Sequence, residues 1–425
     1  MTLWRATLTL LAGGALAQAL PLLLGPWLTR LYSPDDWGRY ALFSAVAANL
    51  GVIACARYEY ALPLALDDGE ARDLMALCLH LLLAVTLLSV LLAALLHATQ
   101  SLDHAVWLPL AVASAGAAQW LTLWANRAQR FKSLSASRVT QFGGAAVFQA
   151  ANGLAQAGSV GLIGGALVAN VGALAWLRHP APTGGWLSLV RVPRDAMHKV
   201  ARQHRSFPLF NTPHTFANAL SDTLTIAMLA ASTGDAAAGF WGLCMRYLKA
   251  PATLVGGALS QALYPRLVGA TAQDARSTVR RAMAALALIG LPLVVLLLAS
   301  GPALFEWAFG ARWREAGELA RALAPYIGMH FIASPLAVVT MAWNAQAWAL
   351  RLALAGQAMF LVALALGLHF GGLLGGAWAV SAATVLYFGW YFWALATWKW
   401  EGQEGVPPGQ GIREQAPHEG EEPHV

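Results

Sequence analysis

Two charged residues, Arg57 and Glu59, interrupt an apolar segment that runs from Tyr40 to Ala65. Counted back from Asp67 at the rise of an α-helix, they lie about 12 to 15 Å from the nearer end of this segment. A charged side chain at that depth in a bilayer costs at least ~3 kcal/mol, so each one needs a partner or a wet cavity. Because residues two apart point to different sides of a helix, these two should not pair with each other. They either bind charged groups or form structural ion pairs with neighbouring helices.

A second pair of cations, Arg246 and Lys249, lies in the apolar segment from Gly239 to Tyr264. Three residues apart, they share one face of a helix, and no acidic residue stands one turn away on either side. Two such cations favour an anionic ligand. They begin only about 10 Å inside the boundary of the segment, so snorkelling to the interface is the structural alternative.

Asp222 is the acidic member of a polar stripe in the segment from Phe207 to Ala230. Asn211, Asn218 and Ser221 can share its helical face, because their spacing follows the helical repeat. The stripe is a candidate proton or cation site that would couple transport to an ion gradient. A structural hydrogen-bond cluster is the alternative.

The elements that must hold these residues are apolar helices. Apolar residues make up 58% of the 425 residues and charged residues only 11%, which is far from the composition of soluble proteins. The sequence therefore predicts an all-α, polytopic membrane protein of about 12 transmembrane helices, arranged as two six-helix lobes around a central cavity. The predicted spans are Thr7–Thr29, Tyr40–Ala65, Leu74–His97, Val106–Ala125, Val139–Ala157, Ser159–Leu177, Phe207–Ala230, Gly239–Tyr264, Met283–Phe305, Leu319–Asn344, Leu352–Phe370 and Leu373–Thr397.

The basic residues predict the orientation of these spans, because Lys and Arg in short loops resist translocation. With both termini on the cytoplasmic side, nineteen of the 27 basic residues fall in inner segments and four on the opposite face. The outer four are Arg30, Arg39, Arg312 and Arg314. The net charge of +6 thus reports topology, and no nucleic-acid partner is expected.

The chain divides into halves around its longest polar stretch. We expect an N-terminal lobe over residues 1–177, a basic cytoplasmic hinge loop over 178–206, a C-terminal lobe over 207–400 and a disordered cytoplasmic tail over 401–425. The halves carry a weak internal repeat at an offset of 201, which pairs Gly38 with Gly239 and Tyr40 with Trp241. Parallel repeats of this kind are typical of transporters, although chance similarity between such biased segments is the alternative.

Prolines and glycines interrupt the leading span of each half. Pro21, Gly25 and Pro26 lie in the first span, and Pro208 and Pro213 at the start of the seventh. Such positions can serve as hinges in alternating access, but they are also common in static transmembrane helices.

The sequence lacks the motifs that several kinds of chemistry require. The sequence has no Walker-type G-x-x-x-x-G-K-S/T loop and no H-E-x-x-H, so neither ATP hydrolysis nor a metal enzyme is supported. Cys55, Cys78 and Cys244 are far apart and fall within predicted spans, where they act as small buried residues. We expect no cofactor and no bound metal, and no soluble domain large enough to be an enzyme.

The opening of the chain resembles the polysaccharide biosynthesis proteins, a family that includes the O-antigen flippases of the multidrug/oligosaccharidyl-lipid/polysaccharide exporter superfamily. The likeness rests on "LTRLYSPDDWGRYALF" from Leu28 to Phe43 and "RYEYALPLA" from Arg57 to Ala65. Motifs similar to those of the family recur, in the family's order along the chain, at "FPLFNTPHTFANALSD", "GFWGLCMRYLKAP" and "LYPRL". The resemblance implies a flippase that moves undecaprenyl-diphosphate-linked sugars from the cytoplasmic to the outer leaflet of the bacterial inner membrane.

On that resemblance, the partners would be a lipid-linked oligosaccharide, membrane lipids, H⁺ or Na⁺ as coupling ion, and other polysaccharide assembly proteins. Arg57 would then contribute to diphosphate binding, and Glu59 would orient a cation or a neighbouring helix. Arg246 and Lys249 would be further cations of the cavity. A multidrug/cation antiporter of the same superfamily and a membrane-embedded polysaccharide polymerase are the alternative functions.

Overall fold

The computed structural model describes residues 19–179, 181–182, 184–268 and 270–398, and these residues contain helices and no strand. A helix satisfies all of its own backbone hydrogen bonds, which the bilayer cannot do for it. Six of the described helices are long and apolar enough to cross a membrane, or seven if one bent pair counts as a span. The chain is therefore a multi-pass membrane protein, and its fold class agrees with the all-α prediction. The exact count of twelve spans is not confirmed.

By packing, the chain divides into two compact units. The first comprises residues 1–242 with 306–313, and the second residues 243–305 with 314–425. The predicted tail, residues 401–425, and most of the predicted first span lie outside the described residues.

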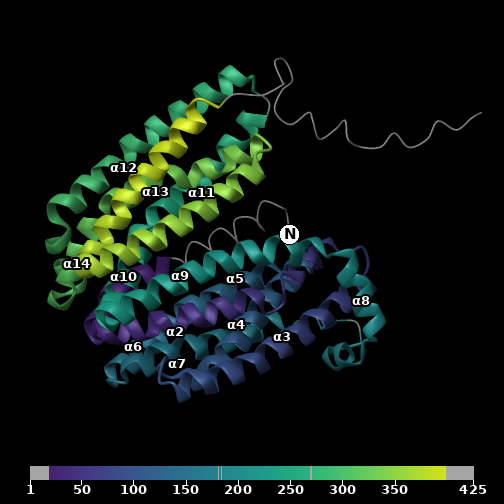
Figure 1. Ribbon diagram of the computed structural model, residues 1–425. Coiled ribbons are helices and arrows are strands. Elements are labelled where there is room, and N and C mark those ends of the chain that lie inside the picture. Colours follow the sequence, from purple (N-terminus) through teal and green to yellow (C-terminus); the bar gives the residue numbers. More distant parts are fainter. Residues whose placement is uncertain (1–18, 180, 183, 269, 399–425) are drawn as a thin grey trace, which may run out of the picture. The chain divides into compact units, whose positions relative to one another are not determined.

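The first unit contains a helix over residues 19–31 and a bundle in which α2, α4 and α7 pack against one another (Figure 1). α9 packs along α2, and α3 packs along α4. Its elements are α2 (Pro34–Ile53), η1 (Tyr58–Leu64), α3 (Asp68–Ala98), η2 (Ala105–Trp107), α4 (Leu108–Arg127), α5 (Phe131–Val139), η3 (Thr140–Gly144), α6 (Ala145–Leu154), α7 (Gly158–Leu177), η4 (Trp186–Arg191), α8 (Arg194–Gln203), η5 (Phe207–Asn211), α9 (Thr212–Thr233) and the start of α10 (Asp235–Leu248).

The predicted span from Tyr40 to Ala65 is not one helix. α2 begins at Pro34, behind a Ser33–Asp36 capping box, and ends at Ile53. The 3₁₀-helix η1 follows at an angle of 52°. Apolar composition predicted a continuous helix. Hydropathy does not report backbone conformation, so it could not reveal the left-handed residues that break the helix.

The central segment between α7 and α9 is more ordered than the predicted basic loop. It contains η4 and α8, and α8 buries Met197 and Val200 in the same cluster as Leu74 of α3 and Leu62 of η1. α8 is therefore an amphipathic helix that packs against α3 and η1 in the first unit.

The second unit is built from the end of α10 and four long helices. α13 packs against both α11 and α14. The four helices are α11 (Ala250–Val268), α12 (Ala272–Phe309), α13 (Arg314–Ala342) and α14 (Gln346–Ala396).

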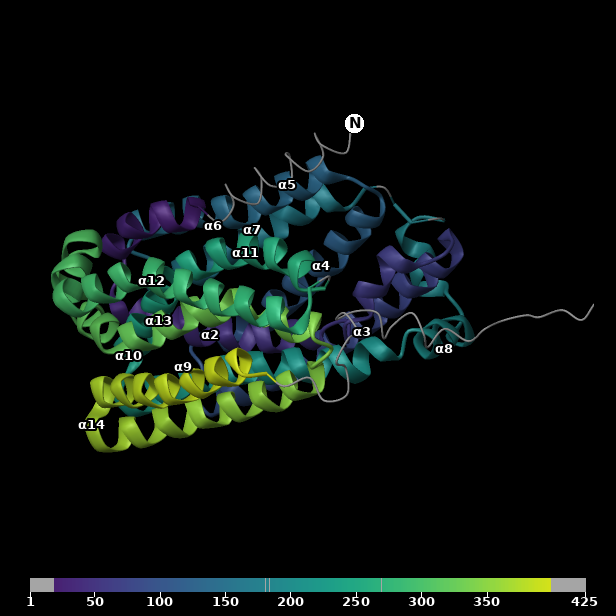
Figure 2. The same cartoon turned by 90° about the horizontal axis from the view of Figure 1, so that it is seen from above.

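α14 is two helices joined at a tight turn. Its 51 residues include non-helical backbone at Gly371 and at Gly372, where φ is 59°. The two halves lie side by side (Figure 2), and the Tyr387 hydroxyl donates to the Leu352 carbonyl at 2.8 Å. The turn falls between the predicted spans that end at Phe370 and begin at Leu373, and glycine permits the positive φ that this turn requires.

The two glycines of the internal repeat pack reciprocally in the first unit. A Cβ added to Gly38 would lie 1.8 Å from the Asp235 carbonyl oxygen, and one added to Gly239 would lie 2.1 Å from the Pro34 carbonyl oxygen. Asp235 stands 201 residues after Pro34, as Gly239 does after Gly38. The first turns of α2 and α10 therefore pack through the same residues of the repeat, and we call this contact the glycine seam.

Polar and aromatic contacts surround the glycine seam. The Arg39 Nε donates to Asp235 at 3.0 Å and lies 3.2 Å from a carboxylate oxygen of Asp103. The fully buried Trp313 meets Trp37 edge-on at 6.2 Å, and its indole N–H donates to the Thr29 carbonyl at 2.9 Å. Residues from four separate parts of the chain thus meet at one place.

A side chain at the glycine seam should weaken the fold. Gly38→Ala and Gly239→Ala should each lower the free energy of unfolding by about 2 kcal/mol, because overpacking outweighs the gain in helix propensity. Thermal unfolding in detergent measures this. Gly164→Ala is the matched control, since no atom lies within 4 Å of its added Cβ. Unfolding of both seam variants at the wild-type temperature would show that the close contact does not form.

Candidate functional site

Arg57 lies at the break between α2 and η1, in a backbone conformation that few side chains adopt. Ala56 and Arg57 have φ values of 48° and 65°, in the left-handed region. The backbone N–H groups of Ala54, Ala56 and Tyr58 donate to carbonyls three residues back, in place of the i to i−4 hydrogen bonds of an α-helix. Strain of this kind persists where the surroundings enforce it, and it is frequent at ligand sites.

The guanidinium of Arg57 lies against Tyr60. Its Nη1 donates to the Tyr60 hydroxyl at 2.9 Å, and its Cζ lies 5.1 Å from the centre of the ring. The Gln119 side chain of α4 donates to the same hydroxyl at 3.0 Å. Because that oxygen accepts two hydrogen bonds, the Tyr60 proton remains to be donated elsewhere. The Arg57 guanidinium and the Tyr60 hydroxyl therefore offer several hydrogen-bond donors to a ligand that carries acceptor oxygens.

Glu59 lies 4.0 Å from Arg57 Nη1, so the two residues do pair weakly. The sequence-based expectation that they would point apart was wrong, because it assumed a continuous helix. Both side chains are largely buried, with exposed fractions of 13% for Arg57 and 4% for Glu59. Within the described residues, Arg57 Nε and Glu59 Oε2 are buried without a hydrogen-bond partner. Such atoms are costly to leave unsatisfied, which makes them candidates for meeting a ligand or water.

Arg127, at the end of α4, holds η1 in place. Its Nη1 donates to the Ala65 carbonyl at 2.5 Å, and its Nη2 donates to the Asp67 carbonyl at 3.2 Å and to the Asp68 carboxylate at 3.3 Å. Arg127 is one of the nineteen basic residues assigned above to the inner segments, where only its charge was considered. Nothing local could have revealed its role, because its partners are mostly backbone carbonyls about sixty residues away.

α8 also contacts η1. The Tyr58 hydroxyl donates to the Ala201 carbonyl at 3.2 Å. His204 Nε2 lies 2.8 Å from Glu70, and Gln203 donates to the same carboxylate oxygen at 2.7 Å. The central segment is thereby fastened to both the residue beside Arg57 and the start of α3.

Glu70 lies outside the membrane-crossing part of α3. The 31 residues of α3 exceed the roughly 20 that cross the hydrocarbon, and its apolar run begins at Leu74. Hydrogen bonds from the Leu66 N–H and from His204 hold the pKa of the Glu70 carboxyl below its usual range. We call the hydrogen bonds of Glu70 with Leu66, Gln203 and His204 the Glu70 clasp. The clasp is therefore formed by the ionised carboxylate.

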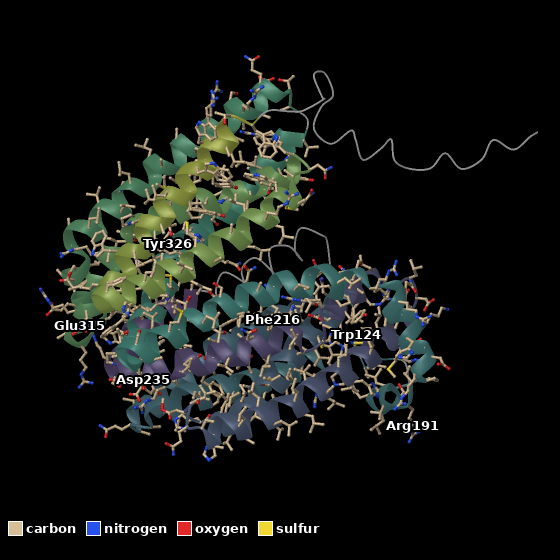
Figure 3. The ribbon with its side chains drawn as sticks, viewed as in Figure 1. Trp124, Arg191, Phe216, Asp235, Glu315 and Tyr326 are labelled. Atoms are coloured by element: carbon tan, nitrogen blue, oxygen red, sulfur yellow. The ribbon has the colours of Figure 1, made fainter. Side chains whose placement is uncertain are left out.

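A second cluster lies in the second unit, where α10 gives way to α11 at Lys249. The Lys249 ammonium lies 5.5 Å from the centre of the Tyr326 ring, a cation–π contact. Tyr326, on α13 (Figure 3), stacks on His330 at 5.9 Å between ring centres. Arg246 lies in the last turn of α10, whereas Lys249 lies just beyond its end, so the shared helical face stays a prediction. Tyr326 and His330 were not predicted as site residues, because no local signal marks residues so distant along the chain.

The polar stripe of α9 is more exposed than a buried ion site. Asp222 and Asn211 are exposed, and Asn218 and Ser221 are half-buried. A neighbouring residue, Thr223, links α9 to α2 by donating to the Ala45 carbonyl at 3.0 Å. The coupling role of the stripe stays a prediction.

The predicted hinge residues lie in helical backbone. Pro21, Gly25 and Pro26 belong to the helix over residues 19–31. Pro208 lies in η5, a π-helical turn, and Pro213 in the first turn of α9. Among the described residues, no three His, Cys, Asp or Glu side chains gather as a metal site, and all three cysteines are buried thiols.

The sequence over residues 73–318 matches the profile of the family described as polysaccharide biosynthesis protein. This match covers more than half of the chain. The chain belongs to the polysaccharide biosynthesis protein family. The resemblance seen in the motifs at Leu28–Phe43 and Arg57–Ala65 is thereby confirmed at the level of the family. No curated protein sequence matches this family member.

Solved structures show the fold of this polysaccharide biosynthesis protein. A lipid II flippase, MurJ, in an inward closed conformation aligns with a TM-score of 0.65 at 10% identity, over 91% of this chain and 89% of that one. A multidrug resistance MATE family transporter of the MOP superfamily, in an inward-facing conformation, aligns with a TM-score of 0.60 at 13% identity, over 89% of this chain and 95% of that one. The chain therefore has the fold of these transporters.

The Glu70 clasp predicts how stability depends on pH. A carboxyl whose pKa is depressed by folding stabilises the fold above its unfolded pKa of about 4.3, and that contribution is lost as the pH falls through the folded value. Wild type should therefore melt at a higher temperature than Glu70→Gln at neutral pH, and the difference should vanish in acid. Glu315→Gln, at an exposed carboxylate (Figure 3), should melt like wild type throughout. Equal melting of wild type and Glu70→Gln at neutral pH would rule out the clasp.

Proposed function

We propose that this protein is a flippase that moves an undecaprenyl-diphosphate-linked oligosaccharide across the bacterial inner membrane during synthesis of a surface polysaccharide such as O-antigen of lipopolysaccharide. The observation that carries the proposal is the buried Arg57, whose Nε lacks a partner among the described residues. Membership of the polysaccharide biosynthesis protein family supports the substrate class.

A diphosphate headgroup matches the donors at the break after α2. A guanidinium can donate two parallel hydrogen bonds to phosphate oxygens, and it remains charged at every physiological pH. The Tyr60 hydroxyl, with its own proton to donate, lies beside it. In our proposal, these groups replace part of the water that a phosphate loses on entering the membrane.

Glu59 would hold Arg57 while the site is empty. At 4.0 Å, the ion pair is too long for a strong hydrogen bond, so a phosphate can compete for the guanidinium. The carboxylate also offsets the charge of Arg57 in a medium of low dielectric constant. We propose an exchange of partners in which the headgroup takes the place of Glu59.

We propose that the transport cycle is alternating access, between two six-span lobes, with both termini in the cytoplasm. On this topology Arg30, Arg39 and Arg312 face outward, so the glycine seam would close the outer side. Its small residues and its exposed Arg39 ion pairs are suited to a contact that forms and separates. Arg246 and Lys249 would contribute further cations to the path.

Loss of the Arg57 guanidinium tests the substrate role. Arg57→Gln should lower delivery of lipid-linked oligosaccharide to the outer leaflet by about tenfold or more, because a charged hydrogen-bond partner of the phosphate is gone. Leaflet-resolved labelling in a deletion strain, normalised to inserted protein, measures it. Arg312→Gln, at an exposed arginine, is the control and should deliver normally. Normal delivery by Arg57→Gln would overturn the proposal.

Ion coupling is tested at Asp222. We propose that Asp222, with the polar side chains of its stripe on α9, binds the H⁺ or Na⁺ that drives transport. Asp222→Asn should slow transport and remove its dependence on the ion gradient in proteoliposomes, since the amide cannot take up the charge. Asp195→Asn, an exposed acid on α8, should retain that dependence. Gradient-driven transport that persists unchanged in Asp222→Asn would exclude the coupling role.

A multidrug/cation antiporter is the second candidate, because one solved structure of the same fold is a multidrug resistance transporter. A cationic drug needs a carboxylate, whereas Glu59 already lies beside Arg57. Dye efflux by the chain in cells with normal oligosaccharide delivery would favour the antiporter.

A further inference from the structure

A cavity at the start of α12 is lined by hydrogen-bond donors. Its volume is about 520 Å³, and it lies ahead of the apolar run that begins at Met283. The lining residues are Gln273, Arg276, Ser277, Arg280 and Arg281. Three guanidinium groups on adjacent turns of one helix make this a site for carboxylates or phosphates.

The acidic residue of the segment that lines this cavity is already engaged in a hydrogen bond. Between residues 266 and 281 the sequence contains four arginines and one acidic residue, Asp274. The Asp274 carboxylate accepts a hydrogen bond from the Thr271 hydroxyl at 2.8 Å, in the cap that begins α12. By sequence, four arginines against one aspartate give residues 266–281 a net charge of +3.

The end of α14 is fastened to the same cavity. Arg280 donates from Nε at 3.0 Å and from Nη2 at 2.6 Å to the carbonyl of Ala396, the last residue of α14. A guanidinium at a helix C-terminus also interacts favourably with the helix dipole. The chain that follows α14 therefore starts beside the arginines.

The sequence that follows is acidic. Residues 401–425, which lie outside the described residues, contain six glutamates and one arginine. An extended chain covers about 3.3 Å per residue, so glutamates throughout this stretch can reach the cavity from Ala396. A tether of this length keeps them at an effective concentration of the order of millimolar.

We propose that glutamates of residues 401–425 occupy the arginine-lined cavity at the start of α12. The stretch would cover a basic surface that otherwise attracts the phosphates of anionic phospholipids or of a lipid-linked substrate. Charge complementarity and the tether at Ala396 favour this occupant over a phospholipid, which has no such attachment. The inference is independent of what the protein transports.

The contact should be reversible and sensitive to salt. Arg280 and Arg281 are exposed, and exposed ion pairs are individually weak. At 0.1 M salt, charges are screened beyond about 10 Å, and at 1 M beyond about 3 Å. Several weak pairs held together by a tether form at low salt and separate at high salt.

Trypsin tests the proposal on the full chain, because it can cut after Arg413, the one arginine of the stretch. In nanodiscs of zwitterionic lipid, release of the fragment 414–425 is followed by mass spectrometry. We expect wild type to release it about fivefold faster at 0.5 M than at 0.05 M salt. Arg276→Gln/Arg281→Gln should release it at the fast rate at both salts, and Arg194→Gln/Lys199→Gln on α8 should match wild type.

A second variant guards against misfolding of the arginine double variant. Glu419→Gln/Glu421→Gln/Glu422→Gln changes only residues outside the described fold, and it should also release the fragment at the fast rate at low salt. Equal release rates in wild type and both variants at low salt would overturn the proposal. So would fast release from wild type in nanodiscs of anionic lipid at low salt, because phospholipid headgroups would then be the occupant.

Discussion

The structure depends on one constraint, that hydrocarbon offers no hydrogen bonds to a broken helix. α2 ends at Ile53, and the carbonyls beyond it need donors that the helix no longer provides. Near the far end of the break, where the chain leaves η1, Arg127 of α4 donates to the carbonyls of Ala65 and Asp67. A cation from another helix thus satisfies backbone carbonyls between η1 and α3. The break in turn turns Arg57 out of a helical position and sets it against Tyr60.

Backbone groups also determine the packing at the glycine seam. Carbonyl oxygens of one first turn approach the Cα of the other, which only residues without a Cβ allow. Because the contact repeats at an offset of 201, each half contributes the same pair of positions. A symmetric contact of small residues has little interdigitation to undo. Around it, the buried Trp313 and the ion pairs of Arg39 add directional contacts that resist sliding.

Sequence reasoning recovered the helices where hydropathy decides the structure. The predicted spans Leu74–His97 and Ser159–Leu177 fall within α3 and α7, and the boundary predicted between Phe370 and Leu373 falls at the turn inside α14. Hydropathy could not reveal the left-handed turn before Arg57, because an apolar residue such as Ala56 leaves the composition unchanged. The partners of Arg57 and Lys249 were likewise hidden. Tyr60 is close in sequence, but Gln119 and Tyr326 become neighbours only through packing of distant helices.

Arginines appear in this chain in two dielectric settings, and their chemistry differs accordingly. Arg57 is largely buried, so its interactions are strong and little screened by salt, and an empty site needs the counter-charge of Glu59 nearby. Arg281 is exposed, so each of its pairs is weak and screened, and only several contacts together give an occupied cavity. The first setting suits selection of one anionic headgroup within the membrane. The exposed setting of Arg281 suits a bound acidic segment that any stronger anion can displace, because water and salt weaken each contact there.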